Sequence, residues 1–129
     1  MKTKQVSVFL ENKLGRLNEV AQILGEAGIN ISAFTVADTS DFGVLRLIVS
    51  DPADACEVLK ENNFSVRTTD VVLVNTSNTP GALSELLKIL DKEDVFIEYL
   101  YAFSMNEDNA VIVIKPSDIE KCLKVMEEQ

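Results

Sequence analysis

The chain has 129 residues, with 12 basic and 21 acidic side chains, a formal net charge of −9 and no histidine. That length corresponds to about one ordinary domain, since domains contain roughly 100–200 residues. Without histidine there is no Ser/His or Cys/His catalytic pair and no imidazole ligand for a metal. The acidic balance disfavours nucleic acid and anionic lipid as partners, because phosphate binding needs clustered lysine and arginine.

No targeting or membrane segment is expected. The longest apolar runs, at 71–74 and 110–114, are far shorter than the roughly 20 residues that span a bilayer. The start of the chain carries Lys2 and Lys4 but lacks the apolar stretch of roughly 7–15 residues that a secretory signal needs. We therefore predict a cytosolic protein without a membrane partner.

The first half of the chain alternates strand and helix patterns. Strands are expected at 6–10, 29–36, 44–49 and 64–69, and helices at 15–27 and 51–61. Gly28 stands where a left-handed residue ends a helix, and Asp51 with Pro52 forms the N-cap and first position of the next one. The order β-α-β-β-α-β is that of the ferredoxin-like motif, an α+β fold.

The second half repeats this order but stops one element earlier. Strands are expected at 71–74, 95–103 and 109–114, and helices at 81–91 and 116–128. The last strand has no counterpart, so something else must cover the sheet edge that it would have protected. The segment 110–114 is apolar on both alternating faces, which predicts burial on both sides, most simply against a second copy in a homodimer. The alternative is a β-prone strand with an exposed apolar face.

A constant offset of 66 residues relates the two halves. It aligns Gly15 with Gly81, Leu17 with Leu83, Ile31 with Ile97, Ile48 with Ile114 and Cys56 with Cys122. We interpret this as a tandem duplication, with units at 1–69 and 70–129. The two cysteines stand on helical patterns outside any C-x-x-C motif, so we expect core thiols; a disulfide between them is the weaker alternative.

The two copies agree best where the first strand enters the first helix. Both read Asn-x-x-Gly-x-Leu, at Asn12 to Leu17 and at Asn78 to Leu83. Glycine allows unusual backbone dihedrals, and the helix start behind it presents unpaired N–H groups that suit a small carboxylate. The alternative is a tight turn with asparagine as a local cap. The glycine patterns of dinucleotide-binding and P-loop proteins are absent.

These residues resemble a known family. The pattern Asn12-x-x-Gly15-x-Leu17-x-x-Val20-x-x-x-Leu24-x-x-x-Gly28-x-Asn30-Ile31-x-x-Phe34 is similar to the signature of the ACT domain, a small amino-acid-sensing module. The second copy keeps Asn78, Pro80-Gly81, Leu83, Leu90 and Ile97. The G-x-N-I segment is similar to that of the regulatory subunits of acetohydroxyacid synthase, which have an additional domain that we do not expect in this chain.

The resemblance implies two ACT-type units set side by side, with their second strands adjoining in one shared antiparallel sheet and the helices on one face. It also implies that amino acids bind between the strand-to-helix loop of one unit and the start of the second strand of its neighbour. The stronger expected site is formed by Asn30, Ile31, Asn78, Thr79, Pro80, Gly81, Ala82 and Leu83. The weaker one is formed by Asn12, Leu14, Gly15, Arg16, Leu17 and Phe96, because Phe96 stands where the first copy has Asn30.

Each polar candidate also has a plain structural explanation. Asn30 fits a strand-edge residue that caps the preceding turn, and Arg16 fits a solvated side chain in the first turn of a helix. The paired acids Asp38 with Asp41 and Glu107 with Asp108 fit solvated hairpin turns, since none has the ligand spacing of a calcium loop. We predict no metal and no cofactor.

The function that these observations favour is a non-catalytic regulatory or sensor protein that binds a small amino acid between two ACT-like units. An alternative is a dimerising adaptor, or a regulatory subunit of a metabolic enzyme, that has lost ligand binding; the degenerate second copy favours it. An enzyme that relies on carboxylates is the least favoured, because no Asp or Glu stands in an apolar catalytic motif.

Overall fold

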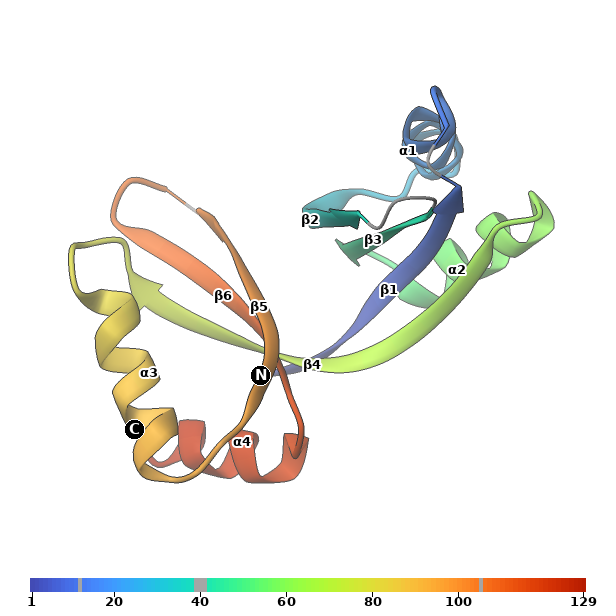
Figure 1. Ribbon diagram of the computed structural model, residues 1–129. Helices are drawn as coiled ribbons and strands as arrows, with labels where there is room; N and C mark the ends of the chain where they lie inside the picture. Colours follow the sequence, from blue (N-terminus) through green and yellow to red (C-terminus); the bar gives the residue numbers. More distant parts are fainter. Residues whose placement is uncertain (12, 39–41, 105) are drawn as a thin grey trace. The chain divides into compact units, whose positions relative to one another are not determined.

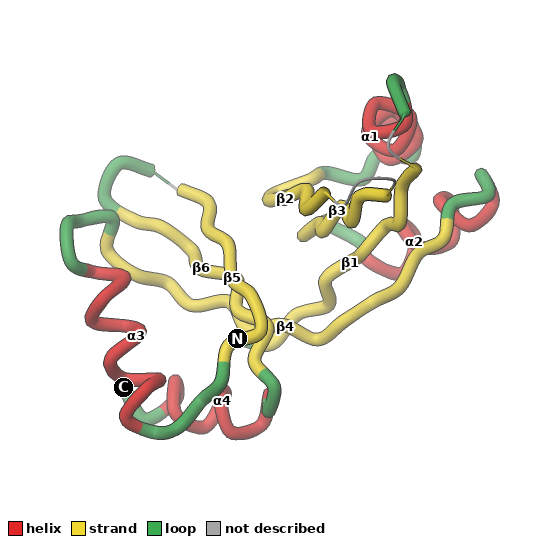
Figure 2. Tube along the Cα trace, in the orientation of Figure 1, coloured by secondary structure: helices red, strands yellow, loops and turns green. Residues whose placement is uncertain are grey.

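A computed structural model describes residues 1–11, 13–38, 42–104 and 106–129. Its elements, in chain order, are β1 (Lys2–Glu11), α1 (Arg16–Glu26), β2 (Ile31–Asp38), β3 (Phe42–Val49), α2 (Pro52–Glu61), β4 (Ser65–Ser77), α3 (Ala82–Lys92), β5 (Ile97–Ser104), β6 (Asn109–Pro116) and α4 (Ile119–Glu127). Figure 1 follows them along the chain, and Figure 2 separates the helices from the strands and loops. The α+β class and the ferredoxin-like element order are as predicted.

The chain divides into two compact units. The N-terminal unit comprises Lys4–Thr69, and the C-terminal unit comprises Asp70–Gln129 together with Met1–Thr3. Strands β1 and β4 therefore contribute residues to both units. The sequence patterns placed a break after Thr69, but the backbone runs on as one strand from Ser65 to Ser77.

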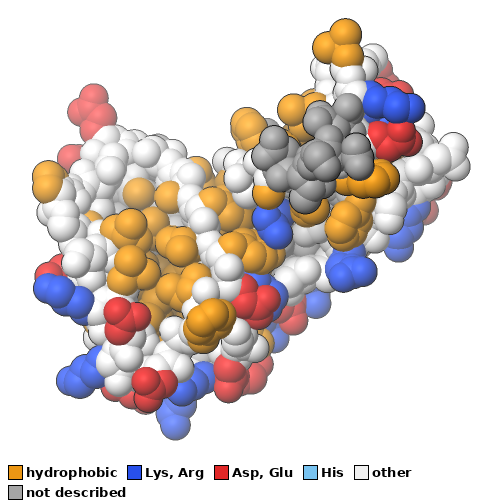
Figure 3. Space-filling model, viewed as in Figure 1, with side chains coloured by type: hydrophobic (Ala, Val, Ile, Leu, Met, Phe, Trp, Pro, Cys, Tyr) orange, Lys and Arg blue, Asp and Glu red, His pale blue; other side chains and the backbone are white. Residues whose placement is uncertain are grey.

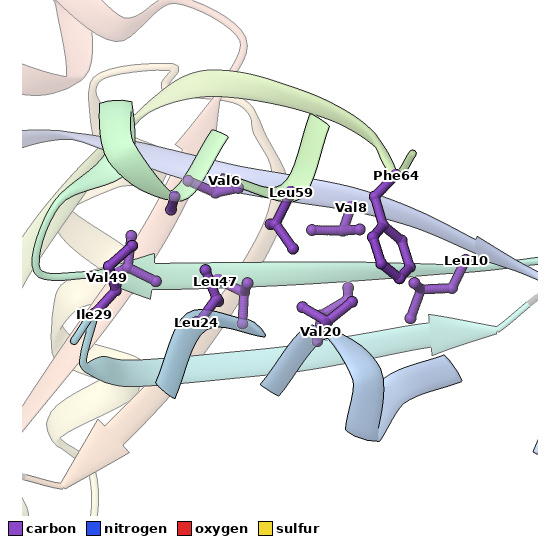
Figure 4. Packing of buried hydrophobic residues seen from close by; sticks show 12 residues of the cluster. Val6, Val8, Leu10, Val20, Leu24, Ile29, Leu47, Val49, Leu59 and Phe64 are labelled. Carbon is purple, nitrogen blue, oxygen red and sulfur yellow. The ribbon is translucent and has the colours of Figure 1, made fainter. Parts of the chain in front are cut away.

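The N-terminal unit has the strand order β2-β3-β1-β4, with antiparallel β1–β3 and β2–β3 pairs. Helices α1 and α2 cover one face of these strands. Figure 4 shows side chains from the strands and helices converging in this core, among them Val6, Val8, Leu24, Leu47 and Leu59. Strand β2 has one strand neighbour in its unit, β3, so it is an edge strand there.

The C-terminal unit repeats this plan with strands β4, β6 and β5, and with α3 and α4 packed on one face. The chain start pairs with β4 on the side away from β6. The N–H of Leu73 donates to the carbonyl of Met1 over 2.7 Å, and the N-terminal amine donates back to the carbonyl of Leu73 over 3.0 Å. Met1–Thr3 thus covers the edge of β4 that faces away from β6, the edge for which the sequence predicts cover by some other segment.

Strand β6 is buried on both faces, as predicted. Val111, Ile112, Val113 and Ile114 are all 5% exposed or less. Ile112 and Ile114 belong to the core beneath α3 and α4, whereas Tyr101 and Phe103 of β5 stand opposite Val113 and Val111. This burial is present in a single chain, so it does not by itself require a second copy.

The helices begin and end where local chemistry directs them. Asp51 caps α2 by accepting from the N–H of Asp54 over 3.0 Å, and Asp118 caps α4 by accepting from the N–H of Lys121 over 3.1 Å. Gly28 follows α1 with a φ of 74°, as expected of a left-handed end residue. The last helix was expected from Pro116, but Pro116 ends β6, because the chain turns into α4 at Asp118.

The offset of 66 does not hold to the end of the repeat. Phe34 and Leu100, which are 66 apart, lie opposite Leu47 and Ile114, which are 67 apart. The capping residues Asp51 and Asp118 are likewise 67 apart. The connection from Ser104 to Asn109 is one residue longer than that from Asp38 to Phe42.

The alignments of Ile48 with Ile114 and of Cys56 with Cys122 are therefore wrong. Ile48 lies opposite Ala33, on the face away from the helices, whereas Ile114 belongs to the core. Cys122 is fully buried in the C-terminal core and takes the position of Ala55. Cys56 is half-buried, and both thiols are free, as expected of core cysteines.

No helix among the described residues is long and apolar enough to cross a membrane. On the face drawn in Figure 3, basic and acidic side chains are scattered among each other and do not gather into a single patch.

Burial raises the pKa of the Cys56 and Cys122 thiols, so less thiolate is present at neutral pH than in the unfolded chain. We expect a disulfide-exchange reagent to label Cys56 before Cys122, and both more slowly than in urea. Labelling should accelerate as the pH rises towards the raised pKa values. The Cys56→Ser variant assigns the slow phase to Cys122. Equal rates for the two thiols in native protein would contradict the packing described.

Candidate functional site

Both strand-to-helix turns place a glycine in the left-handed region. Gly15 has a φ of 90° and Gly81 a φ of 88°, and each is the N-cap of the helix that follows, with no side-chain capping hydrogen bond. Other residues rarely adopt this conformation, which explains why glycine occurs at this position in both copies. The first N–H groups of these helices, on Arg16 and Ala82, donate to the carbonyls of Lys13 and Thr79 over 3.3 and 3.2 Å. The N–H groups of the next two residues in each helix have no hydrogen-bond partner among the described residues and can meet an external acceptor.

A hollow of about 250 Å³ lies beside the second of these turns, and we call it the C-terminal hollow. Its lining comes from 76–79 at the end of β4, 82–83 at the start of α3, 102–104 at the end of β5, and Ala110 with Ile112 on β6. The ends of β4 and β5 meet here because both strands run antiparallel to β6.

Polar groups border the C-terminal hollow. The hydroxyls of Ser77 and Thr79 are 2.9 Å apart and share a hydrogen bond. Asn78 donates from its side-chain amide to the carbonyl of Glu107 over 3.3 Å, and from its backbone N–H to the carbonyl of Asp108 over 2.8 Å. Asn78 therefore ties the loop to the β5–β6 hairpin, and its side-chain oxygen makes no hydrogen bond with a described residue.

A second hollow, which we call the N-terminal hollow, is larger and apolar. It measures about 610 Å³ and lies between the start of α1 and the edge strand β2. Its lining residues are Leu14, Gly15, Leu17, Asn18, Val20, Ala21, Ile31, Phe34, Leu45 and Leu47. Asn18 supplies the polar side chain in that set. The lining of this hollow shares two equivalent positions with the C-terminal hollow, Leu17 with Leu83 and Leu45 with Ile112, so the two hollows lie at different places in their units and differ in chemistry.

The charged groups near the first turn are engaged locally. Arg16 donates to a carboxylate oxygen of Glu19 over 2.7 Å, and its guanidinium carbon lies 4.8 Å from the centre of the Phe64 ring. Lys13 pairs with Glu11 at 2.8 Å, and this hydrogen bond and charge hold the pKa of the Glu11 carboxyl below its usual value. Arg16 is not among the residues that line either hollow.

Asn30 and Phe96 occupy equivalent positions just before the second strands. The carbonyl of Asn30 accepts from the N–H of Ser50, and that of Phe96 accepts from the N–H of Ser117, each over 3.0 Å. Asn30 is exposed, and its backbone N–H donates to the Ser50 hydroxyl over 3.0 Å. Its side-chain amide makes no hydrogen bond with a described residue. Phe96 is 69% exposed.

The predicted site residues separate into the two units. Asn78, Thr79, Ala82 and Leu83 line the C-terminal hollow, with Pro80 and Gly81 in the same turn. The N-terminal hollow includes Leu14, Gly15 and Leu17, and also Ile31, which had been assigned to the other site. Asn12 lies outside the described residues. The pairing of either turn with the second strand of another unit stays a prediction.

Sequence reasoning missed the residues that close the two hollows. These are Thr76, Ser77 and 102–104 in one unit, and Asn18, Phe34 and the floor residues Leu45 and Leu47 in the other. The signal that could have found the strand-end residues is the element order itself. In a β-α-β-β unit the second strand runs parallel to the first, so both end at the edge where the helix begins.

Among the described residues, no group of three or more Cys, Asp or Glu side chains could hold a metal ion.

The chain belongs to the ACT domain family: the family model of the ACT domain pair matches residues 1–129.

Several known proteins are similar to this chain. The crystal structure of protein BT0572 from Bacteroides thetaiotaomicron is 51% identical, with a TM-score of 0.95, covering 99% of this chain and 88% of that one. The regulatory subunit of aspartate kinase from Thermus thermophilus, in its ligand-free form, shares the fold at 14% identity and a TM-score of 0.71, covering 97% of this chain and 91% of that one. The acetolactate synthase small subunit of Buchnera aphidicola subsp. Baizongia pistaciae (strain Bp) is 23% identical over 125 residues, or 82% of this chain and 75% of that protein.

The left-handed turns yield a direct stability test. Replacing Gly15 or Gly81 by alanine should lower the free energy of unfolding by about 1–2 kcal/mol, since an L side chain is strained at that φ. Gly25 lies within α1 with open space around it, and Gly25→Ala should instead raise stability by about 0.5–1 kcal/mol. Urea unfolding followed by circular dichroism measures both. Equal effects at Gly15 and Gly25 would contradict the assigned turn.

Proposed function

We propose that this chain is a non-catalytic regulatory or sensor protein that binds a free amino acid at its strand-to-helix turns. The observation that carries the proposal is the C-terminal hollow. There, the hydroxyls of Ser77 and Thr79 and the free oxygen of Asn78 border a cavity next to a helix start without a side-chain cap. Open N–H groups at a helix start favour a carboxylate, and hydroxyl and amide oxygens can accept from an ammonium group.

The site is completed, in this proposal, by a second copy of the chain in a homodimer. Strand β5 is an edge strand of its unit, with β6 as its strand neighbour there. A strand that docks antiparallel on β5 brings its first residues beside 102–104, where the C-terminal hollow lies. If that strand is β2 of a second copy, Asn30 and Ile31 arrive at the hollow. The unpaired amide of Asn30 then supplies the polar group expected for the α-amino or α-carboxylate end of the ligand.

In this proposal, the amino acid can regulate a partner because its binding depends on how the two copies of the homodimer are arranged. A ligand held by two units favours the arrangement that it fits, and it shifts partner binding only by its difference in affinity between arrangements. The named functions of similar proteins, an acetolactate synthase small subunit and an aspartate kinase regulatory subunit, support a metabolic enzyme as the partner. We place this action in the cytosol.

A second candidate function is an adaptor that has kept the fold and lost the ligand. Two observations favour it. The amide hydrogens of Asn78 are used to hold the β5–β6 hairpin, and Phe96 replaces asparagine at the start of β5. An adaptor uses the edge strands β2 and β5 to bind another chain, and it does not need the hollows because it binds no amino acid.

Thermal unfolding against a panel of the common amino acids distinguishes the two. Under the first proposal, at least one amino acid raises the melting temperature, since a ligand at about 100 times its dissociation constant stabilises the folded state by roughly 2.7 kcal/mol. Asn30→Ala should weaken that response, whereas Gln22→Ala, an exposed change on α1, should preserve it. A flat response to every amino acid would favour the adaptor. An unaltered response in Asn30→Ala would remove Asn30 from the site.

A further inference from the structure

We infer that the N-terminal unit carries an anion site, separate from both strand-to-helix turns, that takes a small phosphate-bearing molecule. The site is a hollow of about 330 Å³ beside α2, which we call the α2 hollow. Its lining residues are Lys4, Pro52, Ala53, Cys56, Lys60, Val66, Arg67 and Thr68. The inference does not depend on amino-acid binding, so it goes beyond the proposed function.

The lining of the α2 hollow is basic in a chain that is acidic overall. The chain has 12 basic and 21 acidic residues, yet three basic residues line this hollow and none of the acidic residues that the structure describes does. A concave surface lined by one sign of charge concentrates the electric field and attracts ions of the opposite sign. The hollow is therefore complementary to an anion, whereas the chain as a whole repels one.

The spacing of residues along α2 separates its basic face from its acidic face. Cys56 and Lys60 are four residues apart, so they lie on one face of the helix, and both line the hollow. Asp54, Glu57 and Glu61 are spaced by three and four residues and share another face, and none of them lines the hollow. The helix thus presents its lysine to the hollow, and not its carboxylates.

Lys60 is the principal cation of the site. It makes no ion pair with a described residue, so its charge is available to an incoming anion. Burial raises the pKa of the Cys56 thiol, and the charge of Lys60 opposes that rise, which indicates that the ammonium and the thiol are close. The guanidinium carbon of Arg67 lies 5.7 Å from the centre of the Phe9 ring. Arg67 therefore adds positive charge to the hollow, while Lys60 and Lys4 contact the phosphate as point charges.

Neutral groups complete the lining. Thr68 carries a hydroxyl, and Ala53 lies in the first turn of α2, where its backbone N–H has no hydrogen-bond partner among the described residues. Both groups can donate to a phosphate oxygen. Pro52 and Val66 supply apolar surface for the rest of the molecule. This combination suits a phosphate group attached to a small organic body.

The size and the place of the hollow fit a small ligand. Its volume of about 330 Å³ lies at the lower end of the roughly 300–1,000 Å³ typical of small-molecule sites. Three cations are too few for the extended phosphate contacts that nucleic acids make. Figure 1 shows α2 beside β1 and the first part of β4. In the strand order β2-β3-β1-β4 this is the end opposite to β2, the edge that the proposed homodimer covers.

Cys56 reports on the site, because it lines the hollow, whereas Cys122 belongs to the other core. Alkylation of the native full chain with iodoacetamide, followed by mass spectrometry, measures the two thiols separately. Glycerol 3-phosphate at about 10 times its dissociation constant should slow alkylation of Cys56 about 10-fold, since about one-tenth of the hollows then remain free. Alkylation of Cys122 should be unchanged. Potassium chloride at the same ionic strength should change neither rate.

Charge-removing variants locate the anion. Lys60→Gln should weaken glycerol 3-phosphate binding about 10-fold in isothermal titration calorimetry, because a hydrogen bond to a charged group is lost. Lys4→Gln should weaken it as well. Lys124→Gln is the matched control, because Lys124 is also an exposed lysine in the last turn of its helix, α4, and does not line the hollow. Its affinity should stay within about twofold of the parent, since salt screens charges more than about 8 Å away.

The outcomes decide both the site and the form of its ligand. Tighter binding of glycerol 3-phosphate than of inorganic phosphate supports the site with a phosphate ester as ligand, and equal affinities support it with free phosphate. No binding of either compound up to about 10 mM, a free energy weaker than about −3 kcal/mol, would overturn the inference. So would equal protection of Cys56 by potassium chloride, or binding that survives both Lys60→Gln and Lys4→Gln in variants that circular dichroism shows to be folded. A flat response to amino acids overturns the proposed function and leaves this inference standing.

Discussion

The left-handed glycine between the first strand and the first helix of each unit is the constraint on which both candidate sites depend. Gly15 and Gly81 each stand four residues after the end of a strand and directly before a helix start that no side chain caps. The turn lies at the edge where the second strand of the unit also ends or turns, so an open helix start and a sheet edge occur together. The hollows follow from that coincidence, and their chemistry is set by the residues on the neighbouring strands.

The two copies are joined by shared strands, so the duplication does not produce two closed domains. Strand β4 ends one unit and begins the other, and Met1–Thr3 hydrogen-bonds to β4 in the C-terminal unit. Met1–Thr3 thereby covers the edge of β4 that faces away from β6. It leaves β2 and β5 as edge strands of their own units, the places where a protein can add a further strand from a partner.

The sequence predicted the helices and strands better than it predicted which residues of the two copies are equivalent. Hydrophobic periodicity, Gly28 and the Asp51-Pro52 pair indicated helix bounds that the structure confirms, because these signals are local. The alignment of Cys56 with Cys122 failed because one extra residue between Ser104 and Asn109 shifts every later position, and residue identity alone could not reveal it. The turn residues of the site were likewise visible in the motif, whereas Phe34 and 102–104 join it only through strand pairing, which depends on contacts distant in sequence.

The central claim is that an amino acid binds at a strand-to-helix turn beside the edge of its sheet. Backbone amide shifts of the ¹⁵N-labelled chain, measured during titration with leucine and then with serine, test it most directly. The account predicts that the perturbed amides cluster at one or both strand-to-helix turns, at 14–18 or at 77–84 with 102–104. Perturbations centred on α2 or α4, or no perturbation with either amino acid, would contradict it.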